Sequence, residues 1–246
     1  MSDSRKTLLL SGASRGIGHA TVSRFSGEGW RVITCSREDI PEDCKRDPNW
    51  THHITADIAE RTGLDHFIGE ANRILDGGPL HALVNNAAVS PKTPFKERLG
   101  CLNGDMEEWR RVFELNFFAP LGLARGLARS LRKGQGAIVN ITSIAGHSTH
   151  PFAGSAYSTS KAALSALTRE LAVEFAELGV RVNAVAPGEI ETSMVGPEYE
   201  TLIPRIPMHR MGTPDEVAGA VYQLCSSDFG YVTGTEVFVT GGQHLY

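Results

Sequence analysis

Tyr157 and Lys161 lie four positions apart in the stretch "GSAYSTSKAAL", residues 154–164. At that spacing the two side chains share one face of a helix. An ammonium group beside a phenol stabilises the phenolate, so such a pair could exchange a proton more readily than a free Tyr. Taken alone, the pair favours a Tyr packed on the core beside a solvated Lys, because such pairs arise by chance in many helices. The surrounding elements must decide between the two interpretations.

A second chemical signal is the stretch "LLLSGASRGIG" (8–18), which joins a short apolar run to a helix-like segment. Gly12, Gly16 and Gly18 allow a tight turn and a close approach of the backbone to a ligand. The N-terminus of the following helix would offer free N–H groups to phosphate oxygens. The spacing is Gly-x-x-x-Gly-x-Gly, which differs from the dinucleotide fingerprint Gly-x-Gly-x-x-Gly. A structural turn is the alternative, but the position between a strand and a helix favours a phosphate-binding loop.

The elements that must position these residues alternate along the chain. Strands are predicted at 7–11, 31–36, 52–56, 81–85, 137–142, 180–186 and 236–240, and helices near 17–28, 62–75, 106–132, 156–178 and 214–226. Several strands are apolar at consecutive positions, as expected when both faces are covered. This alternation predicts an α/β fold with a doubly wound, parallel, seven-stranded sheet and helices on both faces. No repeat, low-complexity tract or linker divides the chain, so we expect one domain over residues 1–246.

Two long irregular stretches, 86–105 and 187–213, follow predicted strands and are rich in Pro and Gly. Loops that leave the C-terminal ends of parallel strands border the usual ligand crevice of such sheets. Connections of this length are usually functional or disordered. We expect the part at about 193–211 to be a lid that closes over an apolar or amphipathic substrate. The next helix opens with "TPDE", in which Thr213 and Glu216 predict a capping box.

Composition excludes several classes of protein. The formal charge of −4 over 246 residues gives no electrostatic reason to expect nucleic acid or an anionic membrane as a partner. The four Cys are scattered and the nine His form no ligand motif, so no metal site is expected. The N-terminal apolar run is too short for a signal peptide, and no stretch approaches the ~18 apolar residues of a membrane span. These features predict a cytoplasmic protein.

Five motifs occur in one order across nearly the whole chain: "ASRGIG" (13–18), "NNAA" (85–88), "NITSIAG" (140–146), "YSTSK" (157–161) and "VNAVAPGEIET" (182–192). Together they resemble the short-chain dehydrogenase/reductase family, and especially its 3-oxoacyl-carrier-protein reductases. Ala88 departs from the family's usual Asn-Asn-Ala-Gly. The resemblance implies a single Rossmann-fold domain that binds NAD(P). It also implies an oxidoreductase that interconverts a ketone and a secondary alcohol by hydride transfer.

The resemblance implies four catalytic residues: Asn116, Ser143, Tyr157 and Lys161. Tyr157 would be the general acid/base, although a free Tyr has a pKa of about 10. Lys161 would lower that pKa and hold the nicotinamide ribose. Ser143 would orient the carbonyl oxygen, and Asn116 would hold a water that links Lys161 to solvent.

The resemblance also implies a set of cofactor contacts besides Tyr157 and Lys161. Asp57 and the backbone of Ile58 would bind the adenine, with a helix N-cap as the competing role for Asp57. Asn85 would stabilise the sheet near the cofactor. The remaining contacts would be Gly12, Ser14, Arg15, Gly16, Ile17, Gly18, Ser36, Arg37, Ala87, Pro187, Gly188, Ile190 and Thr192.

The end of the second strand favours NADP over NAD. Ser36 stands where NAD-binding folds carry an acid for the ribose 2′-hydroxyl, and Arg37 follows it. A guanidinium group can bind a 2′-phosphate through paired hydrogen bonds, and Arg15 adds a second cation. Glu38 and Asp39 lie close enough to offset Arg37, so NAD is the less favoured alternative.

The residues leave the substrate open between a small molecule and an acyl-carrier carbonyl compound. A carrier protein would need a basic patch near the mouth of the site, and four cations of one predicted helix could supply part of it: Arg125, Arg129, Arg132 and Lys133. A solvated helix end is the alternative. His147 and His150 are expected to line the substrate entrance.

Two alternatives to the leading function stay open. The chain could be an NAD(P)-binding regulatory or scaffold protein without catalysis, or an NAD-dependent polyol, sugar or small-alcohol dehydrogenase. The resemblance also implies a homotetramer or dimer that assembles through the helices at 106–132 and 156–178. Small residues in the second helix, such as Ala162 and Ala166, would permit a close helix approach.

Overall fold

A seven-stranded sheet forms the centre of the computed structural model, which describes residues 5–40, 47–93, 97–193 and 196–245. Its strands are β1 (Thr7–Ser11), β2 (Arg31–Ser36), β3 (Trp50–Thr55), β4 (Ala82–Asn85), β5 (Ala137–Ile141), β6 (Arg181–Pro187) and β7 (Glu236–Val239). All pairings are parallel, in the order β3-β2-β1-β4-β5-β6-β7. The order reverses between β1 and β4, and ligands bind at such a switch point in open α/β sheets. The predicted fold class is confirmed.

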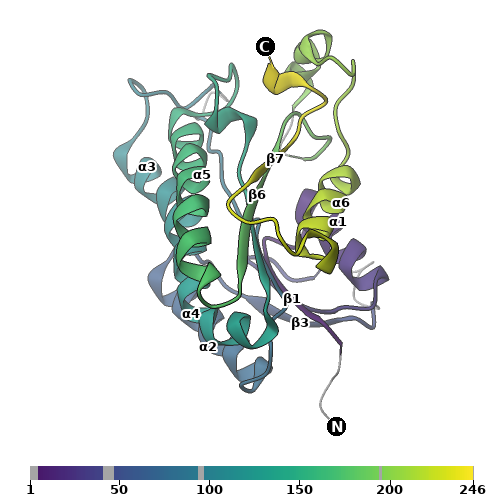
Figure 1. Cartoon of the computed structure of the whole chain (residues 1–246). Coiled ribbons are helices and arrows are strands. Elements are labelled where there is room, and N and C mark those ends of the chain that lie inside the picture. Colours follow the sequence, from purple (N-terminus) through teal and green to yellow (C-terminus); the bar gives the residue numbers. More distant parts are fainter. Residues whose placement is uncertain (1–4, 41–46, 94–96, 194–195, 246) are drawn as a thin grey trace.

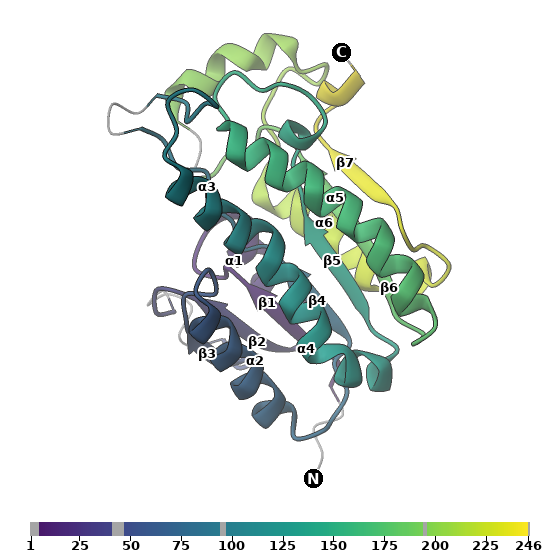
Figure 2. The ribbon, with the colours of Figure 1, turned by 90° about the vertical axis from the view of Figure 1, so that its left-hand side faces the viewer.

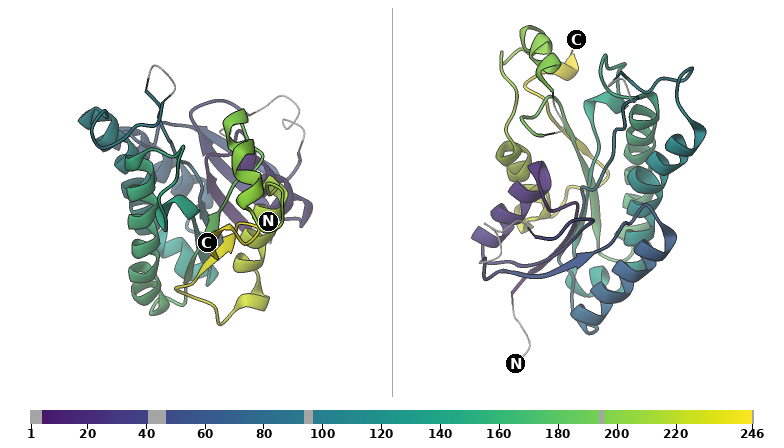
Figure 3. Two further views of the ribbon diagram at one scale, coloured as in Figure 1. Left: turned by 90° about the horizontal axis from the view of Figure 1, so that it is seen from above. Right: turned by 180° about the vertical axis from the view of Figure 1, so that it is seen from behind.

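Helices cover both faces of the sheet (Figures 1 and 2). They are α1 (Gly16–Gly27), α2 (Arg61–Leu75), α3 (Met106–Phe113), α4 (Ala119–Gly134), α5 (Ser155–Ala176) and α6 (Pro214–Cys225). α1 packs against α6 on one face, and α2 packs against α4 on the other, next to α5; Figure 3 shows the layers from above and from behind. In the described part of the chain no helix is long and apolar enough to cross a membrane.

Two apolar layers hold the helices on the sheet. Phe67 of α2, Leu123 of α4 and Phe175 of α5 pack on one face with the strand residues that point toward them. Phe25 of α1 and Val217 of α6 belong to the layer on the other face. Every residue of β1, β4 and β5 is buried, which explains why these strands are apolar at consecutive positions. Each fully buried Leu or Phe contributes about 1.5–3 kcal/mol.

The long helix predicted over 106–132 is interrupted. A π-helical segment, η2 (Glu114–Phe118), separates α3 from α4, and its central residue Asn116 is completely buried. The Asn116 amide donates to the backbone oxygen of Val89, at 3.1 Å, and Asn116 Oδ1 accepts from the Val89 N–H, at 3.0 Å. A wide helical turn of this kind is frequent at functional sites. Hydropathy could not reveal it, because the apolar pattern continues through the segment.

The predicted capping box of α6 is confirmed. Thr213 Oγ1 accepts from the N–H of Glu216 at 3.3 Å, and the Glu216 carboxylate accepts from the N–H of Thr213 at 2.8 Å. Arg210 adds two hydrogen bonds to the same carboxylate, at 2.6 and 2.9 Å. This cap is the end point of the segment that was predicted to be a lid. Part of that segment forms a 3-10 helix, η4 (Pro197–Arg205), while Met194 and Val195 lie outside the described residues.

Candidate active site

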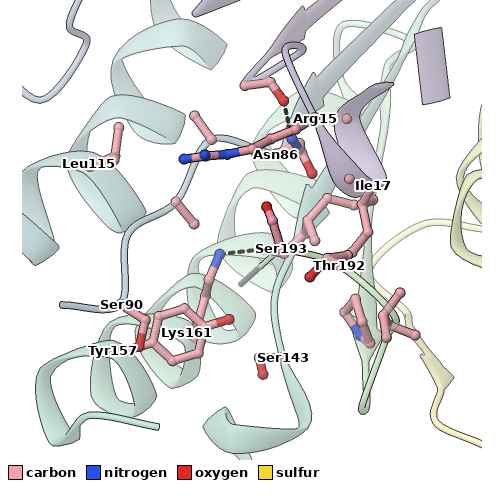
Figure 4. Close-up of a pocket in the computed structure, with 18 of the residues that line it drawn as sticks. Arg15, Ile17, Asn86, Ser90, Leu115, Ser143, Tyr157, Lys161, Thr192 and Ser193 are labelled. Carbon is pink, nitrogen blue, oxygen red and sulfur yellow. Dashed lines mark hydrogen bonds between the residues drawn. The ribbon is translucent and has the colours of Figure 1, made fainter. Parts of the chain in front are cut away.

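One pocket runs along the carboxyl ends of the strands. Most of the residues predicted as site residues line it: Gly12, Ser14, Arg15, Gly16, Ile17, Gly18, Ser36, Arg37, Asp57, Ile58, Ala87, Ser143, Tyr157, Lys161, Pro187, Gly188, Ile190 and Thr192. They come from the carboxyl ends of six strands and from the loops and helices that follow them. Figure 4 shows Ile17 and Thr192 on one side of the cavity, with Ser90 and Tyr157 on the other.

Close backbone packing shapes the glycine loop. Gly12 and Gly16 have φ of +77° and +56°, values that side-chain-bearing residues rarely adopt. A Cβ on Gly18 would lie 1.9 Å from the Gly12 oxygen, and one on Gly12 would lie 2.8 Å from Ala87 Cα. α1 begins at Gly16, and its N-cap residue Arg15 makes no side-chain cap hydrogen bond. The loop therefore leaves the first N–H groups of α1 facing a pocket, which fits the diphosphate of a dinucleotide.

The residues after β2 are held by short local contacts. The Ser36 hydroxyl donates to the Glu38 backbone oxygen at 2.5 Å and lies 3.2 Å from His53 Nε2. Arg37 and Glu38 are both exposed and both line the pocket. A guanidinium group and a carboxylate are therefore both available beside the place of a ribose, and Ser36 adds no charge.

Asp57 has a partner that the sequence did not indicate. Its Oδ2 accepts from Arg111 of α3 at 2.7 Å, and its Oδ1 accepts from the N–H of Ala59 at 3.1 Å. Burial raises the pKa of Asp57, but these hydrogen bonds outweigh burial, so the pKa lies below its ordinary value. The alternative role as N-cap of α2 is not observed, because that helix begins at Arg61 with Glu60 as its N-cap residue.

Tyr157, Lys161 and Ser143 meet at the end of β5 (Figure 4). The Lys161 Nζ donates to the Ile141 backbone oxygen at 2.6 Å and lies 5.7 Å from the centroid of the Tyr157 ring. Ser143 Oγ accepts from the N–H of Ala145 at 3.1 Å, which fixes the hydroxyl at the start of a 3-10 turn. The pair therefore belongs to a concave site and not to a solvated helix face.

The pKa values of this pair differ from the prediction. Burial raises the pKa of Tyr157, and the nearby charge of Glu189 raises it further, although a hydrogen bond with Ser143 acts in the opposite direction. Burial lowers the pKa of Lys161 to about 7. The pKa of Tyr157 therefore lies above its ordinary value and not below it as expected, because burial outweighs the hydrogen bond with Ser143.

Asn116 and Asn85 lie behind the pocket wall. Asn116 donates to Ser160 Oγ at 3.0 Å, in addition to its bonds with Val89. Asn85 donates to Asn140 Oδ1 at 2.8 Å, within the sheet. Both side chains join neighbouring elements at the edge of the site. The water link to Lys161 predicted for Asn116 stays a prediction.

Several pocket residues escaped the sequence analysis. Asn86 donates to the Gly12 oxygen at 2.7 Å and so ties the glycine loop to the end of β4. Glu189, Tyr199 and Lys92 line the other end of the pocket. Asn86 of "NNAA" and Glu189 of "VNAVAPGEIET" lie inside quoted motifs, whereas Lys92 and Tyr199 lie in stretches that carry no motif.

The two His residues and the basic patch that were expected near the mouth of the pocket lie in different places. His150 lines the pocket as expected, whereas His147 pairs with Glu236 at 3.0 Å. The expectation that the cations at the end of α4 form a basic patch near the mouth of the pocket is wrong. Lys133 reaches the Gly77 oxygen, and the Ser130 oxygen accepts from the N–H of Leu80, just before β4 begins. Since α4 runs antiparallel to the strands, its C-terminal cations lie at the opposite end of the sheet from the pocket.

Comparisons with known proteins identify the class of protein. A family model described as enoyl-(acyl carrier protein) reductase matches residues 12–244. An oxidoreductase of the short-chain dehydrogenase/reductase family from Brucella ovis, solved in complex with a partially ordered NAD, is 49% identical. It superposes with a TM-score of 0.84 over 96% of this chain and 100% of its own. The chain belongs to the short-chain dehydrogenase/reductase family, whose enzymes act on alcohol and carbonyl groups.

Two further relatives refine this placement. Protein FixR of Bradyrhizobium diazoefficiens is 53% identical over 242 residues, which are 98% of this chain and 87% of that protein. A 3-oxoacyl-[acyl-carrier protein] reductase from Brucella melitensis with bound NAD is 30% identical, with a TM-score of 0.87 over 98% of this chain and 92% of its own. The predicted family resemblance is confirmed. Similar solved structures contain NAD or NADP.

Proposed function

We propose that the protein is an NADP-dependent oxidoreductase that interconverts a ketone and a secondary alcohol. The observation that carries this proposal is a single pocket in which the glycine loop lies at one end and Ser143, Tyr157 and Lys161 lie together further along. When bound, the nicotinamide cofactor supplies or accepts the hydride. The residues of this chain would position the substrate and the cofactor and would supply the proton.

Tyr157 would exchange the proton at the substrate oxygen. Its raised pKa keeps the phenol protonated at neutral pH, which suits proton donation to a carbonyl oxygen during reduction. Ser143 would donate to the same oxygen and orient it. Lys161 and Asn116 would return a proton to Tyr157 from solvent, with Lys161 held by the Ile141 oxygen and able to change its charge near neutral pH.

The cofactor end would hold the dinucleotide through backbone and a few side chains. The N–H groups at the start of α1 would bind the diphosphate, Asp57 and Ile58 would bind the adenine, and Ile190 and Thr192 would contact the nicotinamide. Arg37 and Arg15 would bind the 2′-phosphate of NADP. Glu38 opposes this choice by its charge, so the preference depends on Arg37.

The proposal is tested with purified protein, NADPH and NADH, and a panel of ketones, by following the loss of reduced cofactor. Turnover with a higher kcat/KM for NADPH supports it. Arg37→Asp should shift the preference toward NADH, whereas the exposed Arg61→Asp on α2 should not. A wild-type preference for NADH would refute the NADP assignment, and cofactor binding without turnover of any ketone would favour a regulatory or scaffold role.

Two structural roles belong to the same proposal. The segment at about 193–211 would act as a lid: Ser193 and Tyr199 line the pocket, while Leu202 and Ile206 are buried. Closure predicts that substrate and cofactor together protect this segment from proteolysis. The chain would also form a dimer or tetramer through the helical region 106–132 and α5, because Phe118 of η2 and Val173 of α5 are apolar and 47% and 74% exposed. Light scattering that gives a monomer would refute the assembly.

A further inference from the structure

A buried carboxylate lies at the substrate end of the pocket, outside the cofactor contacts and the proposed catalytic set. Glu189 follows Pro187 and Gly188 at the end of β6, and it is only 5% exposed. It lines the same pocket as Tyr157 and Ser143. Carboxylates are rarely buried unless their charge is paired, so this side chain needs a physical account.

The hydrogen bonds of His150, the partner of Glu189, show which ring nitrogen carries the proton. His150 Nδ1 accepts from the backbone N–H groups of Phe152 and Ala153, at 3.1 and 3.0 Å. Nδ1 therefore carries no proton, and the neutral ring holds its proton on Nε2, which lies 2.8 Å from Glu189 Oε1. A neutral imidazole donates a hydrogen bond to the carboxylate but supplies no positive charge.

Both donors to the carboxylate use one oxygen. Gln243, from the C-terminal turn, donates to Glu189 Oε1 at 3.1 Å, beside the bond from His150. Among the described residues Oε2 has no hydrogen-bond partner. The carboxylate is therefore oriented by two neutral donors while its charge stays unpaired and one oxygen stays available. Oε2 is not one of the completely buried side-chain atoms that lack a partner in the described part of the chain, so it is accessible from the pocket.

The rings of His150, Tyr157 and Tyr199 line this end of the pocket, and Phe152 packs against Tyr199. The Tyr199 ring centroid lies 5.8 Å from that of His150 and 4.9 Å from that of Phe152. The charge of Glu189 contributes to the raised pKa values of both Tyr157 and Tyr199, which agrees with a position between the two rings. Aromatic faces attract cations, and a carboxylate beside them strengthens that attraction.

Lys92, a cation on the pocket wall near Tyr199, is already paired. Lys92 forms an ion pair with Glu198 at 2.7 Å and lies 5.8 Å from the Tyr199 centroid. Its side chain is 32% exposed, so it lies nearer to solvent than Glu189 does. Lys92 therefore does not neutralise the buried carboxylate.

We propose that Glu189 is the substrate-recognition carboxylate, and that it selects carbonyl compounds that carry a protonated amine close to the reacting carbonyl group. Glu189 Oε2 would accept from the ammonium group, and the ring of Tyr199 would border it. Neutral compounds would leave the charge unpaired, and anionic ones would be repelled. This inference rests on the proposed ketone–alcohol activity, because it names the substrate class of the same pocket.

The first experiment compares three ring ketones of similar size with the cofactor-bound wild type: 1-methyl-4-piperidone below the pKa of its amine, 4-methylcyclohexanone, and 4-oxocyclohexanecarboxylate. The expected kcat/KM is highest for the cation and lowest for the anion. Glu189→Gln should reduce the ratio of cation to neutral ketone by about 10- to 100-fold, the value of a hydrogen bond to a charged group. Glu191→Gln, an exposed carboxylate two residues away, should leave that ratio unchanged. Equal ratios in wild type and Glu189→Gln would overturn the inference.

A second measurement separates this inference from the proposed activity. Ligand-observed NMR with 1-methylpiperidine, which has no carbonyl group, reports binding without turnover. Glu189→Gln should weaken binding by a similar factor, whereas Tyr157→Phe should bind the amine nearly as wild type does. Amine binding that depends on Glu189 without turnover of any ketone would count against the activity alone. No binding to wild type, or equal binding to Glu189→Gln, would overturn the recognition role.

Discussion

The two ends of the pocket are built in different ways. At the cofactor end, three glycines within seven residues bring backbone against backbone, and a Cβ at Gly18 would overlap the Gly12 oxygen. At the substrate end, side chains from segments far apart in the chain meet: His150, Glu189, Tyr199 and Gln243. At the first end, an added Cβ at Gly12 or Gly18 would overlap backbone atoms. At the second end, the contacts are made by side chains, so one of them can be changed without moving the backbone.

The largest expected effect lies where the two ends meet. Tyr157→Phe keeps the ring but removes the proton that the substrate oxygen exchanges, so kcat should fall by about 10²–10⁴-fold. Cofactor affinity should stay near that of wild type, as measured by fluorescence titration. Tyr231→Phe, at a fully exposed residue, is the control for loss of a phenol. Near-normal turnover in Tyr157→Phe would refute the proposed mechanism.

A smaller loss is expected from a single methyl group in the glycine loop. Gly18→Ala places a Cβ against backbone that cannot move aside, so stability should fall by about 1–3 kcal/mol and dinucleotide affinity should fall with it. Gly27→Ala lies on the same helix, where a Cβ meets no atom within 4 Å. The control should be neutral or slightly stabilising. Urea unfolding and cofactor titration of both variants test the rigidity of this end.

The pH dependence of stability tests the charge of Lys161. Its pKa is about 7 in the folded protein and 10.5 without burial, so between these values the unfolded chain binds more protons. Lys161 should therefore increase stability as the pH rises, by about 2 kcal/mol from pH 7 to pH 9 in the cofactor-free protein. Lys161→Met should remove this increment. The difference between the two urea-unfolding series isolates it from other groups, such as the buried Cys residues, and parallel series would contradict the buried, weakly charged Lys.

The smallest effect concerns the link between α3 and Asp57. Arg111→Ala removes the ion pair at 2.7 Å and should cost about 0.5–1 kcal/mol of stability, because both partners are about one-third exposed. Arg110→Ala, next to it, removes an exposed pair with Glu107 and should cost less. If Arg111 helps to orient Asp57 for adenine, only Arg111→Ala should weaken the binding of AMP, measured by calorimetry. An equal change in both variants would leave Arg111 without a role at the cofactor end.

Local patterns predicted much of this protein correctly. Several strands that are apolar at consecutive positions indicated a sheet covered on both faces, and the structure has a parallel sheet of seven strands with helices on both faces (Figure 1). The boundaries of α1, α2, α5 and α6 were predicted within two residues, because caps and periodicity are properties of adjacent residues. The glycine loop was recognisable for the same reason, since the turn and the start of α1 lie within seven residues.

Contacts between residues far apart in the chain depend on the tertiary structure and could not be predicted from spacing in the sequence. Arg111 reaches Asp57 across 54 positions, and Gln243 reaches Glu189 across another 54, so neither pair leaves a local motif. The pKa values of Tyr157 and Lys161 depend on burial, which outweighs the charge effect expected from their four-residue spacing. The side chains at positions 157 and 161 could therefore be assigned to one helix face from the sequence. Their protonation depends on how much water the folded chain excludes, and the contacts of Glu189 with His150 and Gln243 depend on the tertiary fold.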